Sequence, residues 1–465
     1  MLWDRTMRRI LTASLVALAA CSTPPRYERP AVEVPPAWKE SGPRYAEDGR
    51  WWRIYGDPTL DALIDEAFAR NTDLAIAAAR VDEARAIVAD ARGAQLPTLD
   101  ARAAASRQQI SARTATAFPG IPREYSDYRA ALNVSWELDL FGRLRAGVAA
   151  ARADLAASEA AREGVRLALA AQVATSYFAL RAFDEQVDLT RRNVQLREDA
   201  LALQRKRYNG GVISEFDLRQ LEAEAAAVRA QLPPLERQRD AEEAALAVLL
   251  GRTPRQIYED TVARTARFDE SPGGAVPPSG MPSELLLRRP DLVQAERQIA
   301  AANARVAAAR ADMFPSIVLT GFAGRESAAL SNLFTGPAGI WQIAAGVTQP
   351  IFAGGRLEAR TDAARARERQ ALAQYQKTIQ TAFSEVRTAI TAQSRSRESY
   401  DAESARASAL ADAVRLARLR YQNGVASQLD VIDAERGLLA AQSARIEALR
   451  AHRAAIADLF RALGG

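Results

Sequence analysis

Hydrophobic side chains recur every seven residues along two long stretches of this chain. In residues 143–208 they include Val173, Leu180, Val187 and Leu201, and residues 356–421 keep the same register. Neither stretch contains proline. A seven-residue apolar repeat is typical of helices that pack as coiled coils. The pattern therefore predicts two long helices, each extending about 100 Å at the usual rise per residue.

Glycine-containing turns follow both predicted long helices. The first turn lies within YNGGVISEFDL (208–218) and the second within YQNGVASQLDV (421–431). Glycine supplies the left-handed backbone that often ends a helix. We therefore expect the chain to reverse at three glycines: Gly210, Gly211 and Gly424.

A shorter helix is expected to return after each turn, over residues 214–250 and 427–463. Ser214 and Ser427 are candidate N-caps, with an aspartate three residues later in each case. Pro233 and Pro234 predict a break or kink in the first of these return helices, because proline removes a backbone donor.

Each long helix is also preceded by a similar set of elements. An amphipathic helix comes first, over residues 60–95 and 284–313, and ends at a proline. Alternating polar and apolar residues then predict two strands in each half. The four expected strands cover residues 96–110, 128–141, 314–326 and 339–352.

The same order of predicted elements therefore occurs twice along the chain. Tyr208 and Tyr421 are 213 residues apart (421 minus 208), whereas Pro97 and Pro315 are 218 apart (315 minus 97). Two copies of one unit are the simplest explanation. We expect repeat 1 at 59–251 and repeat 2 at 284–465, joined by a linker at 252–283. The predicted fold is mainly α, with long coiled-coil helical hairpins and a small β contribution.

The N-terminal residues have the pattern of a secretory lipoprotein signal. Arginines precede an apolar run at 10–18, and small residues then lead to Cys21, the only cysteine. This predicts a signal peptide at 1–20, starting at Met1 or Met7, with lipid on Cys21 and a linker at 21–58. An ordinary signal peptide followed by an incidental cysteine is the alternative.

Composition argues against several functional classes. The net charge is +5, with cations and carboxylates interspersed along the helices, which is typical of solvated faces and not of a nucleic-acid surface. His452 is the only histidine, so we expect no metal site and no cofactor other than lipid on Cys21. No nucleophile–base group is evident, and we expect no enzyme activity. We expect His452 itself to lie at a solvated surface.

Four strands cannot form a closed barrel, and an open sheet edge is excluded from lipid. If the strands cross a membrane, they must pool with other copies: a dimer would give eight strands and a trimer twelve. A soluble periplasmic coiled-coil protein with a small sandwich is the alternative.

At this point the chain resembles the outer membrane factor family of TolC-like efflux channels, in its lipoprotein branch. The resemblance covers nearly the whole mature chain, in family order. Its motifs are WWRIYGDP (51–58), LDALI (60–64), WELDLFGR (136–143), LRRPDL (287–292), PIFAGGR (350–356) and YQNGV (421–425).

The resemblance implies a homotrimer with a twelve-stranded barrel in the outer membrane and a helical tunnel across the periplasm. It implies a passive exit duct for small molecules, lipid-anchored in the outer membrane, working with a periplasmic adaptor and an inner-membrane pump. A lipid-anchored periplasmic scaffold or adaptor remains the alternative function.

The family's closed gate implies roles for residues at the start of the return helices. Leu429, Asp430 and Asp433 match the residues that narrow the periplasmic entrance, and Asp217 is the counterpart in repeat 1. Asp430 could instead serve only as a charge at the helix N-terminus. An arginine latch of some members is replaced here by Ala426. The turns at Gly210, Gly211 and Gly424 would meet the adaptor.

Overall fold

The structure is a computed structural model that describes residues 49–111, 113, 122–264, 268 and 288–465. The predicted signal peptide, Cys21 and parts of both predicted linkers lie outside the described residues. The described chain forms two compact units. Unit 1 contains residues 80–159 and 294–375, and unit 2 contains the remaining described residues. Each unit therefore contains parts of both predicted repeats.

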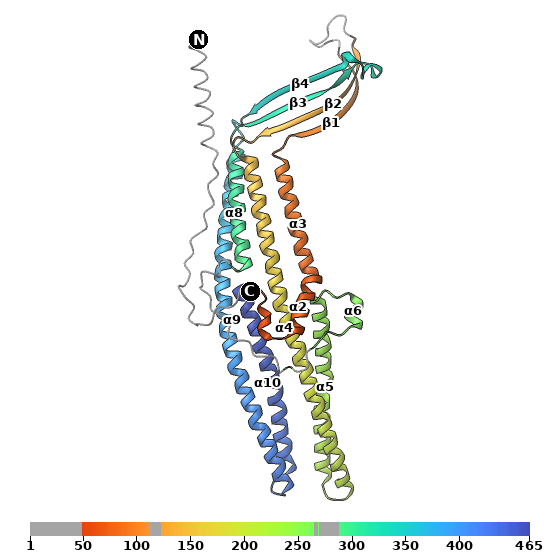
Figure 1. Cartoon of the computed structure of the whole chain (residues 1–465), viewed down its shortest axis with the longest axis vertical. Helices are drawn as coiled ribbons and strands as arrows, with labels where there is room; N and C mark the ends of the chain where they lie inside the picture. The colour runs from red at the N-terminus through yellow and green to blue at the C-terminus, as the bar shows by residue number, and fades with distance from the viewer. Residues whose placement is uncertain (1–48, 112, 114–121, 265–267, 269–287) are drawn as a thin grey trace. The chain divides into compact units, whose positions relative to one another are not determined.

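Unit 1 contains one antiparallel sheet with its strands in chain order (Figure 1). The strands are β1 (Thr98–Gln109), β2 (Glu124–Leu138), β3 (Ser316–Ser327) and β4 (Gly339–Thr348). Two 3-10 turns, η2 (Leu330–Asn332) and η3 (Gly336–Ala338), connect β3 to β4. The four predicted strands are confirmed. β2 begins earlier than predicted because Glu124 still pairs with Gln109.

One face of the sheet is mainly apolar and exposed, and its charged residues, Arg107, Glu124 and Arg325, lie near one end of the strands. Leu99 pairs with Val134, which pairs with Gly321, which pairs in turn with Ile343. Because side chains alternate between faces along a strand, every second residue joins this face. Its large exposed members are Leu99, Leu132, Val134, Trp136, Trp341, Ile343 and Val347. The opposite face carries polar residues such as Asp100, which accepts a hydrogen bond from Asn133 at 3.2 Å.

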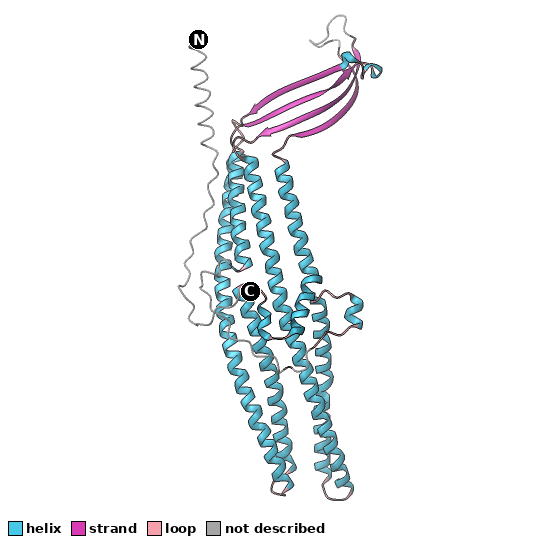
Figure 2. Ribbon diagram, in the orientation of Figure 1, coloured by secondary structure: helices cyan, strands magenta, loops and turns pink. Residues whose placement is uncertain are grey.

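Helices make up most of the described chain (Figure 2). Four of them contribute residues to both units: α3 (Thr72–Gly93), α4 (Arg143–Asn209), α8 (Pro290–Ala311) and α9 (Arg356–Gln422). The others belong to unit 2: η1 (Trp51–Tyr55), α2 (Pro58–Arg70), α5 (Glu215–Leu249), α6 (Pro254–Glu259) and α10 (Gln428–Leu463). The two long helices and the two return helices are confirmed. Of the helices among the described residues, none has both the length and the apolar character needed to span a membrane.

The duplication is visible in the bounds of the elements. The strand β1 and the strand β3 begin 218 residues apart (316 minus 98) and end at the same offset. The helices α4 and α9 begin 213 residues apart (356 minus 143) and also end at that offset. The two repeats therefore share one order of elements, with a constant offset on each side of the strand hairpins.

The single opening helix predicted over 60–95 is wrong, because the chain forms two helices, α2 and α3, separated at Asn71. Asn71 has an extended backbone, with φ −62° and ψ 131°. Its side-chain oxygen accepts a hydrogen bond from the Leu74 backbone N–H at 3.0 Å, so it caps α3. Its amide nitrogen donates to the Leu249 carbonyl at 2.9 Å. In repeat 2, Arg289 donates to the Ala462 carbonyl at 2.9 Å, which is the equivalent contact.

A break at Pro233 and Pro234 is also wrong, because α5 continues through both prolines. Both side chains are exposed. The carbonyl groups that lose their helical donors on this face can therefore bind water, which lowers the cost of keeping proline inside the helix.

The core of unit 2 forms around the motif at 51–58. Trp51 stacks on Phe460 of α10 with ring centroids 5.2 Å apart, and the Tyr55 hydroxyl donates to the Arg453 carbonyl at 2.7 Å. Asp57, 3% exposed, accepts hydrogen bonds from the backbone N–H of Thr59 and from the Tyr177 hydroxyl. These contacts join the first described residues to α4 and α10.

The predicted surface position of His452 is wrong. His452 is 2% exposed, and its Nδ1 lies 3.2 Å from the Ser396 hydroxyl oxygen. Burial lowers the pKa of the imidazole, since the charged form loses its hydration. The ring is therefore a neutral core group between α9 and α10. A lone histidine in an alanine-rich helix gave no sign of this packing.

Candidate functional site

Both helical hairpins of unit 2 end in the same type of turn. Gly211 and Gly424 each have φ 72°, the left-handed conformation that glycine adopts without strain. The Val212 backbone N–H donates to the Arg207 carbonyl at 2.9 Å, and Val425 donates to the Arg420 carbonyl at 3.0 Å. The prediction that glycines end the long helices is confirmed for these two positions.

Gly210 differs from the other two glycines in the predicted turns. Its φ is not positive. The equivalent position in repeat 2 is Asn423, which shows that the turn does not need glycine there. Gly210 therefore lies within the turn, as expected, but the left-handed residue of that turn is Gly211.

The return helices begin with complete capping boxes. Ser214 and Asp217 exchange hydrogen bonds at the start of α5, and Ser427 and Asp430 do so at the start of α10. The Asp430 carboxylate accepts from the Ser427 backbone N–H at 2.8 Å. This hydrogen bond holds the pKa of Asp430 below its usual value, so the carboxylate is ionised at neutral pH.

The other gate candidates lie beside this cap. Leu429 is 46% exposed at the second position of α10. Asp433 lies one turn further on, 3.6 Å from the Arg436 guanidinium. The structure thus places Leu429, Asp430 and Asp433 together at the beginning of α10, whereas Asp217 occupies the corresponding place on α5.

Each hairpin contains one ion pair that has an exact counterpart in the other hairpin. Arg205 of α4 donates to Glu222 of α5 at 3.0 Å, and Arg418 of α9 donates to Glu435 of α10 at 2.7 Å. The two pairs are related by the 213-residue offset. Each repeat therefore ties its own long helix to its own return helix in the same way.

Two further ion pairs join the hairpins of the two repeats. Arg197 of α4, 7% exposed, donates to Glu435 of α10 at 2.6 Å. Arg436 of α10 donates to Glu224 of α5 at 2.8 Å. The sequence prediction missed these links. Their signal was a difference between the repeats, because Leu410 and Gly437 occupy the positions equivalent to Arg197 and Glu224.

A groove runs along the same part of unit 2. It has a volume of about 660 Å³ and is formed by α4, α9 and α10. Four arginines line it, together with Glu435 and several leucines: Arg192, Arg197, Arg415 and Arg418. Leu196 and Leu419 on its walls are about half exposed. The groove therefore combines apolar area with positive charge.

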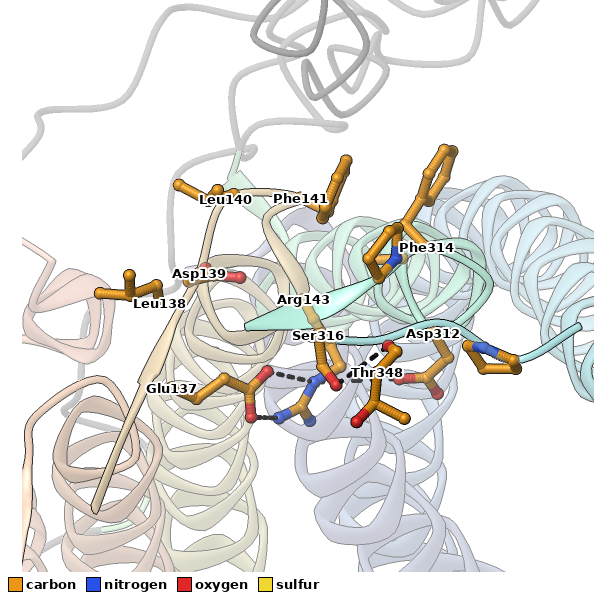
Figure 3. Close-up of a pocket in the computed structure, with 13 residues that line it drawn as sticks. Glu137, Leu138, Asp139, Leu140, Phe141, Arg143, Asp312, Phe314, Ser316 and Thr348 are labelled. Carbon is orange, nitrogen blue, oxygen red and sulfur yellow. Dashed lines mark hydrogen bonds and ion pairs between the residues drawn. The ribbon is translucent and has the colours of Figure 1, made fainter. Parts of the chain in front are cut away.

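In unit 1, the junction between strands and helices is fixed by the motif at 136–143 (Figure 3). Arg143 binds both carboxylate oxygens of Glu137, at 2.6 and 3.1 Å, and lies 3.9 Å from Asp312. The Asp139 carboxylate accepts from the Leu144 backbone N–H at 3.1 Å and caps α4. Phe141 stacks on Phe314 with centroids 5.1 Å apart.

A cavity of about 270 Å³ lies at this junction, lined by the same residues. Arg143 already pairs there with Glu137 and Asp312, so the arrangement aligns β2 and α4 of repeat 1 with the segment between α8 and β3 of repeat 2. Within the described ranges, no cluster of three or more His, Cys, Asp or Glu side chains is placed to hold a metal ion.

A four-stranded sheet with one exposed apolar face and two capped coiled-coil hairpins define a class of protein, the channels that cross the bacterial outer membrane. The family model described as outer membrane efflux protein matches residues 63–252 and 281–465. The chain belongs to this family, and the resemblance drawn from its motifs is confirmed.

Named relatives agree over nearly the whole chain. The chain is 35% identical to "Probable efflux pump outer membrane protein TtgC" of Pseudomonas putida, with 98% of this chain and 96% of that protein covered. It is 36% identical to "Outer membrane protein OprJ" of Pseudomonas aeruginosa, with 98% and 95% covered.

Solved structures show the same fold. The Neisseria gonorrhoeae MtrE outer membrane channel, in its open state, has a TM-score of 0.85 and 36% identity, covering 96% of this chain and 98% of that chain. A membrane protein from Pseudomonas aeruginosa has a TM-score of 0.86 and 34% identity, covering 96% and 100%. The predicted outer-membrane efflux channel and its location in the outer membrane are therefore confirmed.

Proposed function

We propose that three copies of this chain form one passive channel for the export of small molecules. The observation that carries the proposal is the sheet with an apolar face and two edges, β1 and β4. Strand edges within hydrocarbon must be paired. Three copies supply twelve strands, enough for a water-filled lumen, whereas eight strands leave an interior filled by side chains.

The test is the mass and the conductance of the purified protein. Native mass spectrometry in mild detergent should give a trimer, and the same material should produce discrete conductance steps in a planar bilayer. A protein that stays monomeric and never perforates the bilayer would contradict the proposal. So would turnover of a substrate without any conductance, which would point to an enzyme.

We propose that the channel acts with a periplasmic adaptor and an inner-membrane pump that supplies the energy. The turns after α4 and α9 present exposed residues, and the groove beside Arg197 offers leucines and arginines to a partner helix. Crosslinking from Asn209 or Asn423 to a co-expressed adaptor should give a defined product. The absence of a product at every position of both turns would count against this partner.

Leu429, Asp430 and Asp433 are proposed to narrow the periplasmic entrance. A trimer would bring six carboxylates from Asp430 and Asp433 near one axis, and like charges in a narrow space attract cations. Asp217 would add three more charges from the first repeat.

Replacing both aspartates, Asp430→Ala with Asp433→Ala, should lower cation selectivity and raise the leak of small ions. Single-channel conductance and reversal potential in a salt gradient measure both. The matched control is Asp217→Ala with Gln220→Ala, which loses the same type of capping box but only half as many carboxylates. We expect about half of the selectivity change in the control, and no change in the double variant would refute the charged gate.

Cys21 is proposed to carry the lipid that anchors the chain. Cys21→Ser should leave the protein without the acyl mass that intact-protein mass spectrometry detects, while the variant should still form a trimer if the strands hold it in the membrane. An unmodified Cys21 in the native protein would show that the leader is an ordinary signal peptide.

A further inference from the structure

The strands β1 and β4 form the two edges of the sheet. The internal duplication of the chain can be used to infer how β4 of one copy pairs with β1 of another. Each edge presents a row of backbone donors and acceptors toward the next strand. In the proposed trimer, which this inference assumes, β4 of one copy lies beside β1 of the next. That junction joins repeat 2 of one copy to repeat 1 of another.

The two offsets of the duplication already relate the two strand hairpins. Thr98 of β1 pairs with Ser135 of β2. Adding 218 to the first number and 213 to the second gives Ser316 and Thr348, and this pair is the one observed between β3 and β4. The offsets thus reproduce the register of the second hairpin from the first.

The pairing of β2 with β3 is the junction between the two repeats within one chain. Ser135 of β2 pairs with Thr320 of β3, and Tyr128 pairs with Ser327. Adding 213 to a β2 residue number gives its counterpart in β4, and subtracting 218 from a β3 residue number gives its counterpart in β1. The same pairing applied to these counterparts describes the boundary between two copies.

We propose that β4 pairs with β1 of the partner subunit in the register that this operation gives. Thr348 then lies opposite Arg102 of the partner subunit, and Trp341 lies opposite Gln109 of the partner subunit. Eight residues of β4, from 341 to 348, pair with residues 109 to 102 in descending order.

The distribution of side chains supports this register independently. Val347, on the apolar face, meets Ala103 of the partner subunit, which is on the same face as Leu99. Gln342, on the polar face, meets Gln108 of the partner subunit. A slip by one residue would put Trp341 and Ile343 on the face that carries Asp100 and Arg102. Arg107 of the partner subunit, opposite Ile343 in the proposed register, is on the Leu99 face, but it lies near the end of β1, where it pairs with Glu124 at 3.1 Å.

Slips by two residues preserve the faces, so an experiment must separate them from the proposed register. Paired cysteines do this, because a disulfide forms only when the two Cα atoms lie within about 7 Å. The proposed pairs are Gln342→Cys with Gln108→Cys, and Ile343→Cys with Arg107→Cys. One of two adjacent pairs is the closer, non-hydrogen-bonded type in any antiparallel ladder.

The control variants keep Gln108→Cys and place the second cysteine two residues away, at Ile340→Cys or Ala344→Cys. Variants with only one of the two new cysteines show how much crosslinked product arises from disulfides with Cys21. The full-length protein is oxidised in membranes and run on denaturing gels. At least one proposed pair should shift the protein from monomer to covalent dimer and trimer. The slipped pairs should give no more crosslinked product than the single-cysteine variants.

Three results would overturn the register while leaving the proposed function intact, provided that the protein is trimeric by mass. These are preferential crosslinking of Ile340→Cys, preferential crosslinking of Ala344→Cys, and no crosslinking of any pair when both cysteines react with a maleimide. A monomeric mass would instead contradict the proposed assembly itself.

Discussion

Replacing Asp57 by alanine should lower the free energy of unfolding by about 3–5 kcal/mol, the usual cost of removing one partner from a buried ion pair. The Asp57 carboxylate lies 3.9 Å from the Arg181 guanidinium, and both side chains are at most 5% exposed. It also accepts a hydrogen bond from the Tyr177 hydroxyl at 2.7 Å. Its loss would leave the positive charge of Arg181 in the core without this carboxylate.

The same side chain caps α2, so alanine has a second cost. Asp57 accepts from the backbone N–H of Thr59 at 2.9 Å, and losing such a cap costs about 1 kcal/mol. Asp57→Asn removes the charge and keeps a side-chain acceptor, so the difference between the two variants measures the cap and the Tyr177 hydrogen bond together. Denaturant unfolding of the detergent-solubilised protein gives both values.

The matched control for this experiment is Asp61→Ala. Asp61 is in the first turn of the same helix, is partly exposed and lies 4.0 Å from Arg53. An exposed pair of this kind contributes at most about 1 kcal/mol. Equal stability of Asp57→Ala and Asp61→Ala would show that the carboxylate at 57 does not hold this core together.

Much of the fold could be predicted from the chain because it depends on local pattern. The heptads of α4 and α9, the alternation in the strands and the capping serines are each read from residues close in sequence. The bounds of α2 and α3 could not be obtained in this way. The alanine-rich pattern continues through Asn71, and the break there depends on a contact with Leu249, which is distant in sequence.

In the candidate site, too, the features that depend on local sequence could be predicted and those that depend on distant contacts could not. The turns and capping boxes follow from short motifs, and the structure confirms them at Gly211, Gly424 and both return helices. The links between hairpins depend on which helices lie side by side. No local pattern pairs Arg197 with Glu435. The comparison of the two repeats singles out Arg197, whose counterpart is Leu410, but not Glu435, whose counterpart Glu222 is also a glutamate.

That difference leads to the prediction with the largest expected effect on transport. Glu435 binds Arg418 of its own hairpin and Arg197 of the other hairpin, whereas Glu222, its counterpart, binds Arg205 within its own hairpin. Glu435→Gln therefore weakens the junction between hairpins, and Glu222→Gln does not. If the hairpins separate when the proposed entrance opens, the loss of this link favours the open form.

Glu435→Gln should raise the resting conductance of reconstituted channels by roughly tenfold, because about 1.4 kcal/mol less stabilisation of the closed form changes the two populations by that factor. Breaking a buried ion pair can supply at least this much. Glu222→Gln is the matched control, since it loses the equivalent pair inside a hairpin. Equal conductance of the two variants would assign the effect to the hairpins themselves, and the link between Arg197 and Glu435 would then have no part in closing the channel.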